Sequence, residues 1–263
     1  MTAPHQPSTS PRGIDRANER GRAVREMFSA IAARYDLLNH LLSLNMDRWW
    51  RRRAVDRLGW EARPRGRYVD VCAGTYDLAL ELARRPGFLG HVIAVDFSLA
   101  MLVRGISKIR HRPIAPACGD ALRLPLVSRA FDGAMVAFGV RNLADIDRGL
   151  REMLRLLGPG SRLVILDFAM PARGLLGTLY RFYFARVLPL VGRLVSKHSY
   201  AYNYLPESVL DFSPPAELAA RMAAAGFGDV GWERLTAGIA CVWWGCRPAA
   251  EARVPDGDLT DRA

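Results

Sequence analysis

Polar residues at the ends of three apolar segments have the types and spacing of a cofactor site. Asp70, Gly74 and Thr75 lie in the stretch DVCAGTYD, which is typical of a turn between a first strand and a first helix. Asp96 ends the next apolar run and can accept hydrogen bonds from two ribose hydroxyls. Asp120 follows a third run and can contact an adenine amino group. Ligands of open parallel sheets bind beyond the carboxyl ends of the strands, so this order predicts one shared site.

Tyr76 is the anomaly in this pattern, because it stands where the last glycine of such a turn is expected. Glycine serves where the backbone needs a positive φ or approaches a ligand closely. A side chain there strains the turn by roughly 1–3 kcal/mol or projects into the cofactor pocket. If Tyr76 points outward the cost is negligible, and if it fills the pocket the cofactor cannot bind. On the steric reading, replacing Tyr76 with Gly is expected to strengthen cofactor binding.

The elements that position these residues alternate between strand and helix. Strands are expected at 68–72, 91–96, 114–118, 131–138 and 163–168, with helices at 78–84, from Ser98 onward and at 146–157. Alternation of this kind predicts a parallel sheet with helices on both faces. A helix at 214–225 and a hairpin of strands at 228–235 and 239–245 follow. An α/β sheet that ends in an antiparallel hairpin is the outline of class I S-adenosylmethionine-dependent methyltransferases, a Rossmann-like fold.

Length, charge and cysteine usage narrow the class of protein. The chain has 263 residues and a net charge of +11, with the basic cluster WWRRR at 49–53. A basic surface attracts nucleic acid, anionic lipid or an acidic substrate, and no nucleic-acid-binding motif accompanies it. The four cysteines form no CxxC pair, the histidines have no metal-ligand spacing, and no metal is expected. The polar N-terminus and the lack of a long apolar run predict a cytoplasmic protein.

The expected organisation is one domain at 21–247 between disordered ends at 1–20 and 248–263. Residues 21–60 are expected to form a helical cap. Residues 170–212 form an apolar, aromatic insertion on the substrate side that is interrupted by Arg181, Arg186 and Arg193.

Several longer motifs then give a specific resemblance that spans residues 24–247. They are MFSAIAARYDLLNH (27–40), WRRRA (50–54), VDFS (95–98) with Met101 and Leu102, LPL (124–126), FGVRN (138–142), EMLRLLGPG (152–160) and YNYLPES (202–208). In these motifs the chain resembles the ubiquinone/menaquinone biosynthesis C-methyltransferases, especially the demethylmenaquinone methyltransferases.

The resemblance implies methyl transfer from S-adenosyl-L-methionine to a ring carbon of a prenylated hydroquinone. It places the cofactor at Thr75, Asp96, Asp120 and Ala121, beside Gly74. Arg141 and Asn142 are the expected catalytic residues, since an arginine can stabilise a developing phenolate or orient a water that takes the proton. The simpler interpretation of Arg141 is a salt bridge within its loop. Asp167 stands where the family tends to have glutamate.

The resemblance also implies a lipid-like partner. The insertion can line a channel for the isoprenoid tail or contact the inner face of the membrane, as can the arginines near Trp49. Ordinary core helices or a homodimer face are equally consistent with its composition. Tyr200, Tyr202, Asn203 and Tyr204 are candidates for ring contacts, and His198 for a proton acceptor. The resemblance favours a naphthoquinone acceptor over a benzoquinone, with demethylmenaquinol converted to menaquinol. Because Tyr76 replaces the expected glycine, the alternative is a non-catalytic quinone-binding or scaffold protein of the same family.

Overall fold

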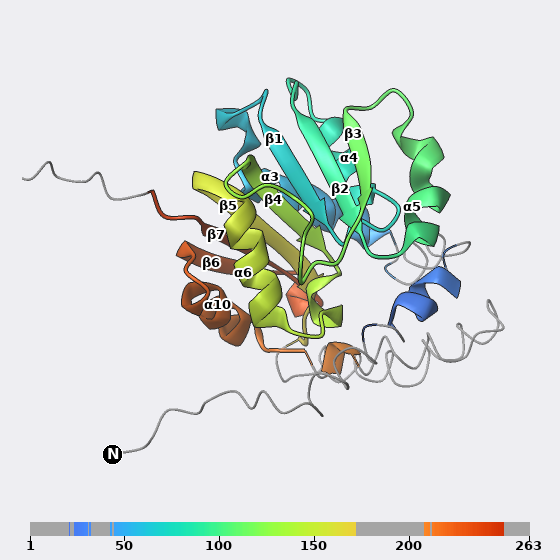
Figure 1. Ribbon diagram of the computed structural model, residues 1–263. Helices are drawn as coiled ribbons and strands as arrows, with labels where there is room; N and C mark the ends of the chain where they lie inside the picture. Colours follow the sequence, from blue (N-terminus) through green and yellow to red (C-terminus); the bar gives the residue numbers. More distant parts are fainter. Residues whose placement is uncertain are drawn as a thin grey trace, which may run out of the picture.

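The computed structural model describes residues 45–171 and 212–249, with 24–30, 208–210 and residues 21, 32 and 43 in addition. Its centre is a seven-stranded sheet in the order β3-β2-β1-β4-β5-β7-β6 (Figure 1). The strands are β1 (Arg67–Val71), β2 (His91–Asp96), β3 (Ile114–Cys118), β4 (Phe131–Ala137), β5 (Leu157–Phe168), β6 (Gly228–Leu235) and β7 (Ala240–Cys246). The first five strands pair in parallel, which brings their carboxyl ends to one edge.

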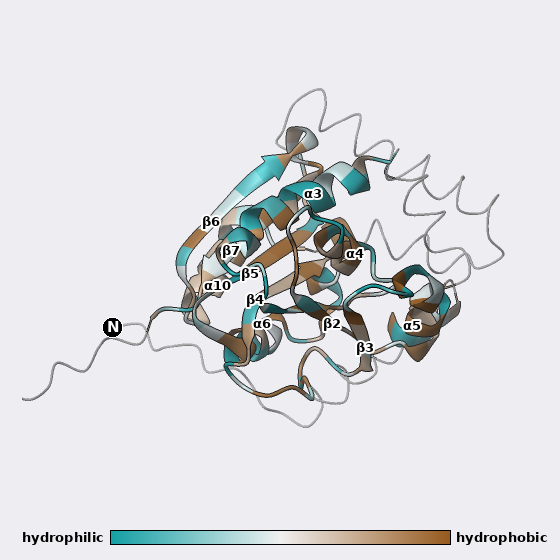
Figure 2. Ribbon diagram, turned by 90° about the horizontal axis from the view of Figure 1, so that it is seen from above, coloured by the Kyte–Doolittle hydropathy of each residue, from teal (hydrophilic) through white to brown (hydrophobic). Residues whose placement is uncertain are grey.

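Helices cover both faces of this sheet (Figure 2). They are α3 (Met46–Leu58), α4 (Asp77–Ala83), α5 (Leu99–Gly105), α6 (Ile146–Leu156) and α10 (Pro215–Ala224). Trp50 and Leu58 of α3 share one buried cluster with Leu80 of α4. Leu150 of α6 and Met222 of α10 belong to a second cluster. The sheet therefore lies between two apolar layers, as the alternation of strands and helices predicts.

The antiparallel end of the sheet is built by β6 and β7, which are joined through a short 3₁₀ turn at Thr236–Gly238. β7 runs antiparallel to β5. Along β7, Ala240 and Val242 enter one cluster while Cys241 and Trp243 enter the other. Successive side chains point to opposite faces of a strand, so both faces of β7 are buried. The predicted hairpin at the end of the sheet is confirmed.

The start of β5 differs from the prediction by several residues, whereas the other predicted strand boundaries shift by at most one residue. β5 starts at Leu157, directly after α6, whereas the sequence places the start of this strand at Leu163. Leu157 pairs with Phe131 ahead of a register shift, and Gly160 takes a φ of 71°. Gly160 and Ser161 exchange backbone hydrogen bonds with Arg247. Gly158, Pro159 and Gly160 end the helix as expected, but they continue into a bulged strand instead of a free loop.

Parts of the predicted organisation lie outside the described residues. These are the N-terminal segment 1–20, most of the tail at 248–263, and residues 172–207 of the insertion, which include His198, Tyr200, Tyr202, Asn203 and Tyr204. Within the part of the chain that the structure describes, no helix has the length and hydrophobicity needed to cross a membrane.

Candidate active site

Asp96 joins the ends of the first two parallel strands. β1 and β2 pair in register from Arg67 with His91 to Val71 with Val95, so the turn after β1 meets the end of β2. The Asp96 carboxylate accepts a hydrogen bond from Gly74 N at 2.8 Å through Oδ2 and from Ser98 N at 2.8 Å through Oδ1. It is 6% exposed, and burial raises the pKa of this carboxyl. Each carboxylate oxygen can still accept a further hydrogen bond.

Asp120 extends the same edge by one strand. β3 pairs with β2 up to Cys118 opposite Asp96, and Gly119 N donates to Asp96 O at 3.0 Å. Asp120 Oδ1 accepts from Leu122 N at 2.9 Å, which holds the exposed carboxylate in a tight turn. Ala121 is buried beside it, and Thr75 is buried in the first turn. The structure thus gathers Gly74, Thr75, Asp96, Asp120 and Ala121 at neighbouring strand ends.

The backbone of Tyr76 has the left-handed conformation that a glycine would take. Its φ is 70° and its ψ is 18°, at the position that precedes the first residue of α4. Cys72 and Phe138, after β1 and β4, also have positive φ values of 56° and 58°. Left-handed backbone at non-glycine residues is uncommon and costly, and it clusters at functional sites. The expectation of a glycine at position 76 therefore has a local physical reason.

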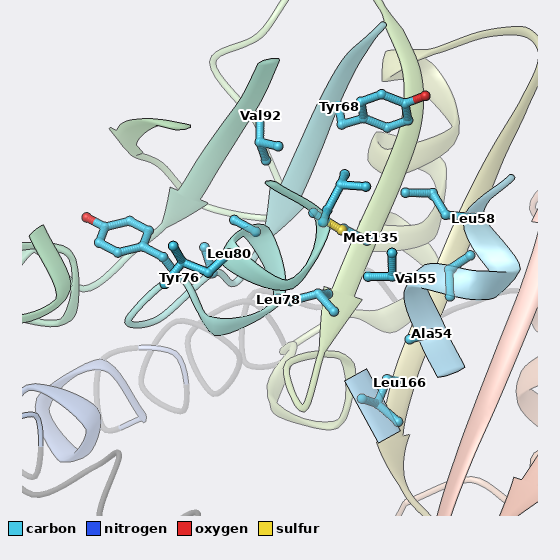
Figure 3. Packing of buried hydrophobic residues seen from close by; sticks show 14 of the residues in the cluster. Ala54, Val55, Leu58, Tyr68, Tyr76, Leu78, Leu80, Val92, Met135 and Leu166 are labelled. Carbon is cyan, nitrogen blue, oxygen red and sulfur yellow. The ribbon is translucent and has the colours of Figure 1, made fainter. Parts of the chain in front are cut away.

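The Tyr76 side chain takes neither of the two orientations considered from the sequence. It is fully buried in the hydrophobic core, where its hydroxyl donates a hydrogen bond to Leu102 O of α5 at 2.7 Å. In Figure 3 its ring extends away from Leu78 and Met135. A Cβ on Gly105 would lie 2.7 Å from the Tyr76 ring, so the ring fits because position 105 has no side chain. Burial raises the pKa of Tyr76 to about 12, which keeps the hydroxyl a donor.

The balance of energies at Tyr76 favours the aromatic residue. A left-handed non-glycine residue costs about 1–2 kcal/mol. Removing a buried aromatic side chain typically costs about 3–5 kcal/mol, because a cavity remains. Tyr76 is therefore expected to stabilise the fold despite its backbone strain.

Asp70 lies in β1, and its carboxylate helps to hold the turn that follows this strand. Its Oδ2 accepts from Ala79 N of α4 at 3.0 Å, while its buried Oδ1 has no hydrogen-bond partner among the described residues. Burial, with the charge of Asp96 adding to it, raises the pKa of Asp70 to about 8, against the opposing hydrogen bond from Ala79. Asp70 thus fastens the start of α4 to the strand that carries the turn.

Arg141 and Asn142 lie in a short 3₁₀ turn, η4 (Val140–Asn142), after β4. Arg141 Nη1 donates to Asp167 Oδ1 at 2.6 Å and to Phe138 O at 2.6 Å. Asn142 Nδ2 donates to the same carbonyl at 3.1 Å. Arg141 therefore forms a salt bridge, but its partner is Asp167 at the end of β5 and not a residue of its own loop. Arg141 Nε is buried and has no hydrogen-bond partner within the described part of the chain.

An aromatic group next to Arg141 was not predicted as part of the site. The rings of Phe138 and Phe168 lie 4.8 Å apart, and Trp50 of α3 lies 6.2 Å from Phe138 and 6.0 Å from Phe168. The Arg141 guanidinium lies 5.2 Å from the centre of the Phe168 ring. Trp50 was considered as part of a basic cluster and of the motif WRRRA, but not of the site, although its spacing to the apolar residues of α3 indicates a buried helix face.

The predicted basic cluster at 49–53 is not a continuous exposed surface. Arg51 is 6% exposed and forms an ion pair with Asp47, and a further ion pair joins it to Asp77 at 3.7 Å. Arg53 pairs with Glu233 at 3.1 Å. One turn of helix places Asp47 and Arg51 on the same face, so these charges are satisfied within the fold. Of the run from Trp49 to Arg53, only Trp49 and Arg52 are exposed.

The loops after β1 and β4 touch, which joins the two halves of the site. A Cβ on Gly139 would lie 2.5 Å from Cys72 Cβ, so position 139 accepts only glycine in this arrangement. The cofactor residues and the Arg141 turn therefore follow the carboxyl ends of parallel strands β1 to β4, which lie side by side in the sheet (Figure 1). With acceptors left on Asp96, an exposed carboxylate at Asp120 and the Tyr76 ring turned into the core, the residues present fit a nucleoside cofactor.

This strand order and this arrangement of carboxylates define a class I S-adenosylmethionine-dependent methyltransferase. Solved structures share the fold. A methyltransferase from Thermotoga maritima has a TM-score of 0.60 at 22% identity and covers 84% of this chain and 98% of its own. A Haemonchus contortus phosphoethanolamine N-methyltransferase in complex with S-adenosylmethionine has a TM-score of 0.52 at 14% identity, over 69% of this chain and 48% of its own.

Sequence comparison defines the family. The model of the ubiE/COQ5 methyltransferase family matches residues 15–247. The demethylmenaquinone methyltransferase of Thermus thermophilus is 49% identical, over 84% of this chain and 100% of its own. The one from Deinococcus radiodurans is 46% identical, over 93% and 99%. The UbiE C-methyltransferase of Geobacter sulfurreducens is 44% identical, over 88% and 90%. The chain belongs to the ubiE/COQ5 methyltransferase family and is an S-adenosylmethionine-dependent C-methyltransferase.

Proposed function

We propose that this protein methylates a ring carbon of a prenylated hydroquinone, with demethylmenaquinol to menaquinol as the best supported reaction. The relatives with 49% and 46% identity carry the name demethylmenaquinone methyltransferase, which favours a naphthoquinone acceptor. The observation that carries the proposal is that the Tyr76 ring is buried in the core with its hydroxyl on Leu102 O, so that it points toward α5 and does not project from the turn as an obstacle to the cofactor.

In the proposed cofactor site, the residues at each strand end bind a different part of S-adenosylmethionine. The Asp96 carboxylate binds the two ribose hydroxyls, and Asp120 with Ala121 binds the adenine. The Gly74–Thr75 turn approaches the methionine part, since Gly74 takes a φ of 53° and brings backbone close to the site. S-adenosylmethionine supplies an electrophilic methyl group on its sulfonium, and the protein has to align and shield it.

Arg141 is proposed to act on the acceptor ring. A ring carbon becomes nucleophilic when the neighbouring phenol loses its proton, and the negative charge that develops needs a donor. The Nη1 atom of Arg141 is held by Asp167 and Phe138. Its Nε, which has no hydrogen-bond partner among the described residues, is a remaining donor for a phenolate oxygen or for a water that takes the proton. Asn142 fixes the same turn through Phe138 O. Buried donors stabilise such charge more strongly than exposed ones.

Contact with the membrane surface belongs to this proposal, because a prenylated acceptor resides in lipid. Leu99, Val103 and Ile106 are exposed at helical spacing on α5 and the 3₁₀ turn that follows it. The chain has no acidic residue from Phe97 to Gly119, and Arg110 and Arg112 are exposed there. Sedimentation with vesicles of anionic and of neutral lipid tests the contact. If the protein sediments with neither type of vesicle, the proposed contact is contradicted.

The homodimer stays a prediction that light scattering in solution can test.

The experiment that tests the function is a titration followed by an assay. The purified protein is titrated with S-adenosylmethionine in a calorimeter and is then supplied with demethylmenaquinol and with a demethylated benzoquinol. Saturable binding and a menaquinol product of one added methyl group are expected. Quinol binding without cofactor binding would instead support the non-catalytic alternative. Faster methylation of the benzoquinol would reassign the acceptor.

A further inference from the structure

We infer that Tyr76 is a positioning residue for the cofactor, which fastens the cofactor turn to helix α5. The inference rests on the proposed function, in which Gly74, Thr75 and Asp96 bind S-adenosylmethionine. Tyr76 follows directly on Gly74 and Thr75, and its hydroxyl reaches Leu102 O at 2.7 Å. The side chain that looks like an obstacle in the sequence is thus a brace between the turn and its neighbouring helix.

The turn is held to α5 at two separate points. At the start of the helix, Asp96 accepts from both Gly74 N and Ser98 N, each at 2.8 Å. At the middle of the helix, the Tyr76 hydroxyl donates to the Leu102 carbonyl. The Ile106 amide donates to Val103 O and not to Leu102 O, so this amide does not compete with the Tyr76 hydroxyl for the Leu102 carbonyl. A turn fixed at two points of one helix has little freedom to move away from the ribose site.

Gly105 completes this arrangement. A Cβ at position 105 would lie 2.7 Å and 2.8 Å from two atoms of the Tyr76 ring, and 2.8 Å from Thr75 Cα. The helix therefore approaches the turn as closely as backbone permits. Tyr76 and Gly105 form a matched pair, with the large residue on the turn and the missing side chain on the helix.

Replacing Tyr76 with Phe tests the brace, because the ring stays and only the hydrogen bond is lost. We expect the Kd for S-adenosylmethionine, measured by calorimetry, to rise by about three- to tenfold, since one hydrogen bond no longer holds the competent turn. The KM for the quinol is expected to stay within about twofold. Tyr76→Gly is expected to weaken cofactor binding too, which is the opposite of the purely steric expectation.

Tyr68→Phe is the matched control. Tyr68 is also buried and donates through its hydroxyl to a backbone carbonyl, Arg63 O at 2.8 Å, at the other end of β1. It is expected to lower thermal stability without changing cofactor affinity. If both variants lower stability equally and both retain wild-type affinity, Tyr76 has only a structural role and the inference is wrong. Tighter binding by Tyr76→Gly would also overturn it.

Hydrogen exchange of the wild-type protein gives a second measurement that does not depend on any variant. Added S-adenosylmethionine is expected to slow exchange at Gly74–Asp77 and at Gly105–Ile106 together, because the brace couples them. Protection of the turn alone would contradict the coupling. If the wild-type protein shows no cofactor binding at all, the proposed function itself is wrong. This outcome is distinct from one in which the cofactor binds but Tyr76 does not position the turn.

Discussion

The guanidinium of Arg141 and the carboxylate of Asp167 meet at 2.6 Å, where the ends of β4 and β5 lie side by side. Asp167 is fully buried and Arg141 is 8% exposed. Asp167 also accepts from Phe168 N at 2.8 Å, so one carboxylate fixes both the Arg141 turn and the last residue of β5. Replacing one member of a buried ion pair leaves the charge of the other uncompensated. Substitutions at either Arg141 or Asp167 are therefore expected to be costly.

Arg141→Lys is expected to separate the two roles of this residue. Lysine keeps the charge but cannot span Asp167 and Phe138 O with a planar fork while presenting a further donor. We expect kcat to fall by at least about a hundredfold at neutral pH, on the scale of one lost oxyanion donor. Part of the loss should be recovered at alkaline pH, where the quinol ionises without help. The pH profile of kcat measures this, and a uniform loss at every pH would limit Arg141 to holding the loop.

Asp96→Ala is expected to weaken S-adenosylmethionine binding by about ten- to a hundredfold. The variant removes the proposed acceptor for two ribose hydroxyls and releases Gly74 N and Ser98 N. Hydrogen bonds to charged groups contribute about 1.5–3 kcal/mol, which sets this range. Calorimetric titration measures it. Asp132→Ala serves as the comparison, because Asp132 binds Arg63 and Arg67 N at the opposite end of the sheet. Equal effects of the two variants would contradict the assigned cofactor site.

Asp70→Asn is expected to stabilise the fold increasingly as the pH rises. The pKa of Asp70 is raised from 3.8 to about 8 in the folded state, so the folded protein holds this proton more tightly than the unfolded chain. Wild-type stability therefore falls between about pH 4 and pH 8. Asparagine has no charge to bury and keeps an acceptor for Ala79 N. Urea unfolding at pH 5, 7 and 8.5 should show a difference in unfolding free energy that widens with pH, and a constant difference would contradict it.

Gly105→Ala is expected to destabilise the protein, although alanine is usually the better helix residue by about 1 kcal/mol. The added Cβ would meet the Tyr76 ring and the Thr75 backbone at 2.7–2.8 Å. Overpacking of a buried site typically costs about 1–3 kcal/mol. Gly228→Ala is the control, because its nearest neighbours would lie 3.7 Å and 3.9 Å away. Thermal unfolding of the two variants measures the contrast, and an unchanged melting temperature for Gly105→Ala would argue against close contact with Tyr76.

The local pattern of the sequence predicted most of the sheet. Ser98 was expected to begin a helix, and its hydroxyl accepts from Met101 N in the structure. The order of Gly74, Asp96 and Asp120 also predicted their shared edge, because parallel strands bring consecutive carboxyl ends together. Arg141 and Asn142 were placed after β4 on the same ground. The start of β5 was missed because the bulge at Gly160 depends on Arg247, far along the chain.

From its sequence alone this chain is predicted to be an α/β protein with acidic residues at strand ends, since strand and helix periods and strand-end positions are local properties. The methyltransferase assignment came from the resemblance of its longer motifs, such as FGVRN and YNYLPES, to a known family. Only the tertiary structure decided that Tyr76 turns into the core, that Arg51 is buried, and that Asp167 is the partner of Arg141. A side chain's direction depends on what packs against it, and the space for Tyr76 exists because Gly105 lies opposite on another element. Such a fit between distant residues is a property of packing, which a single position in the sequence does not display.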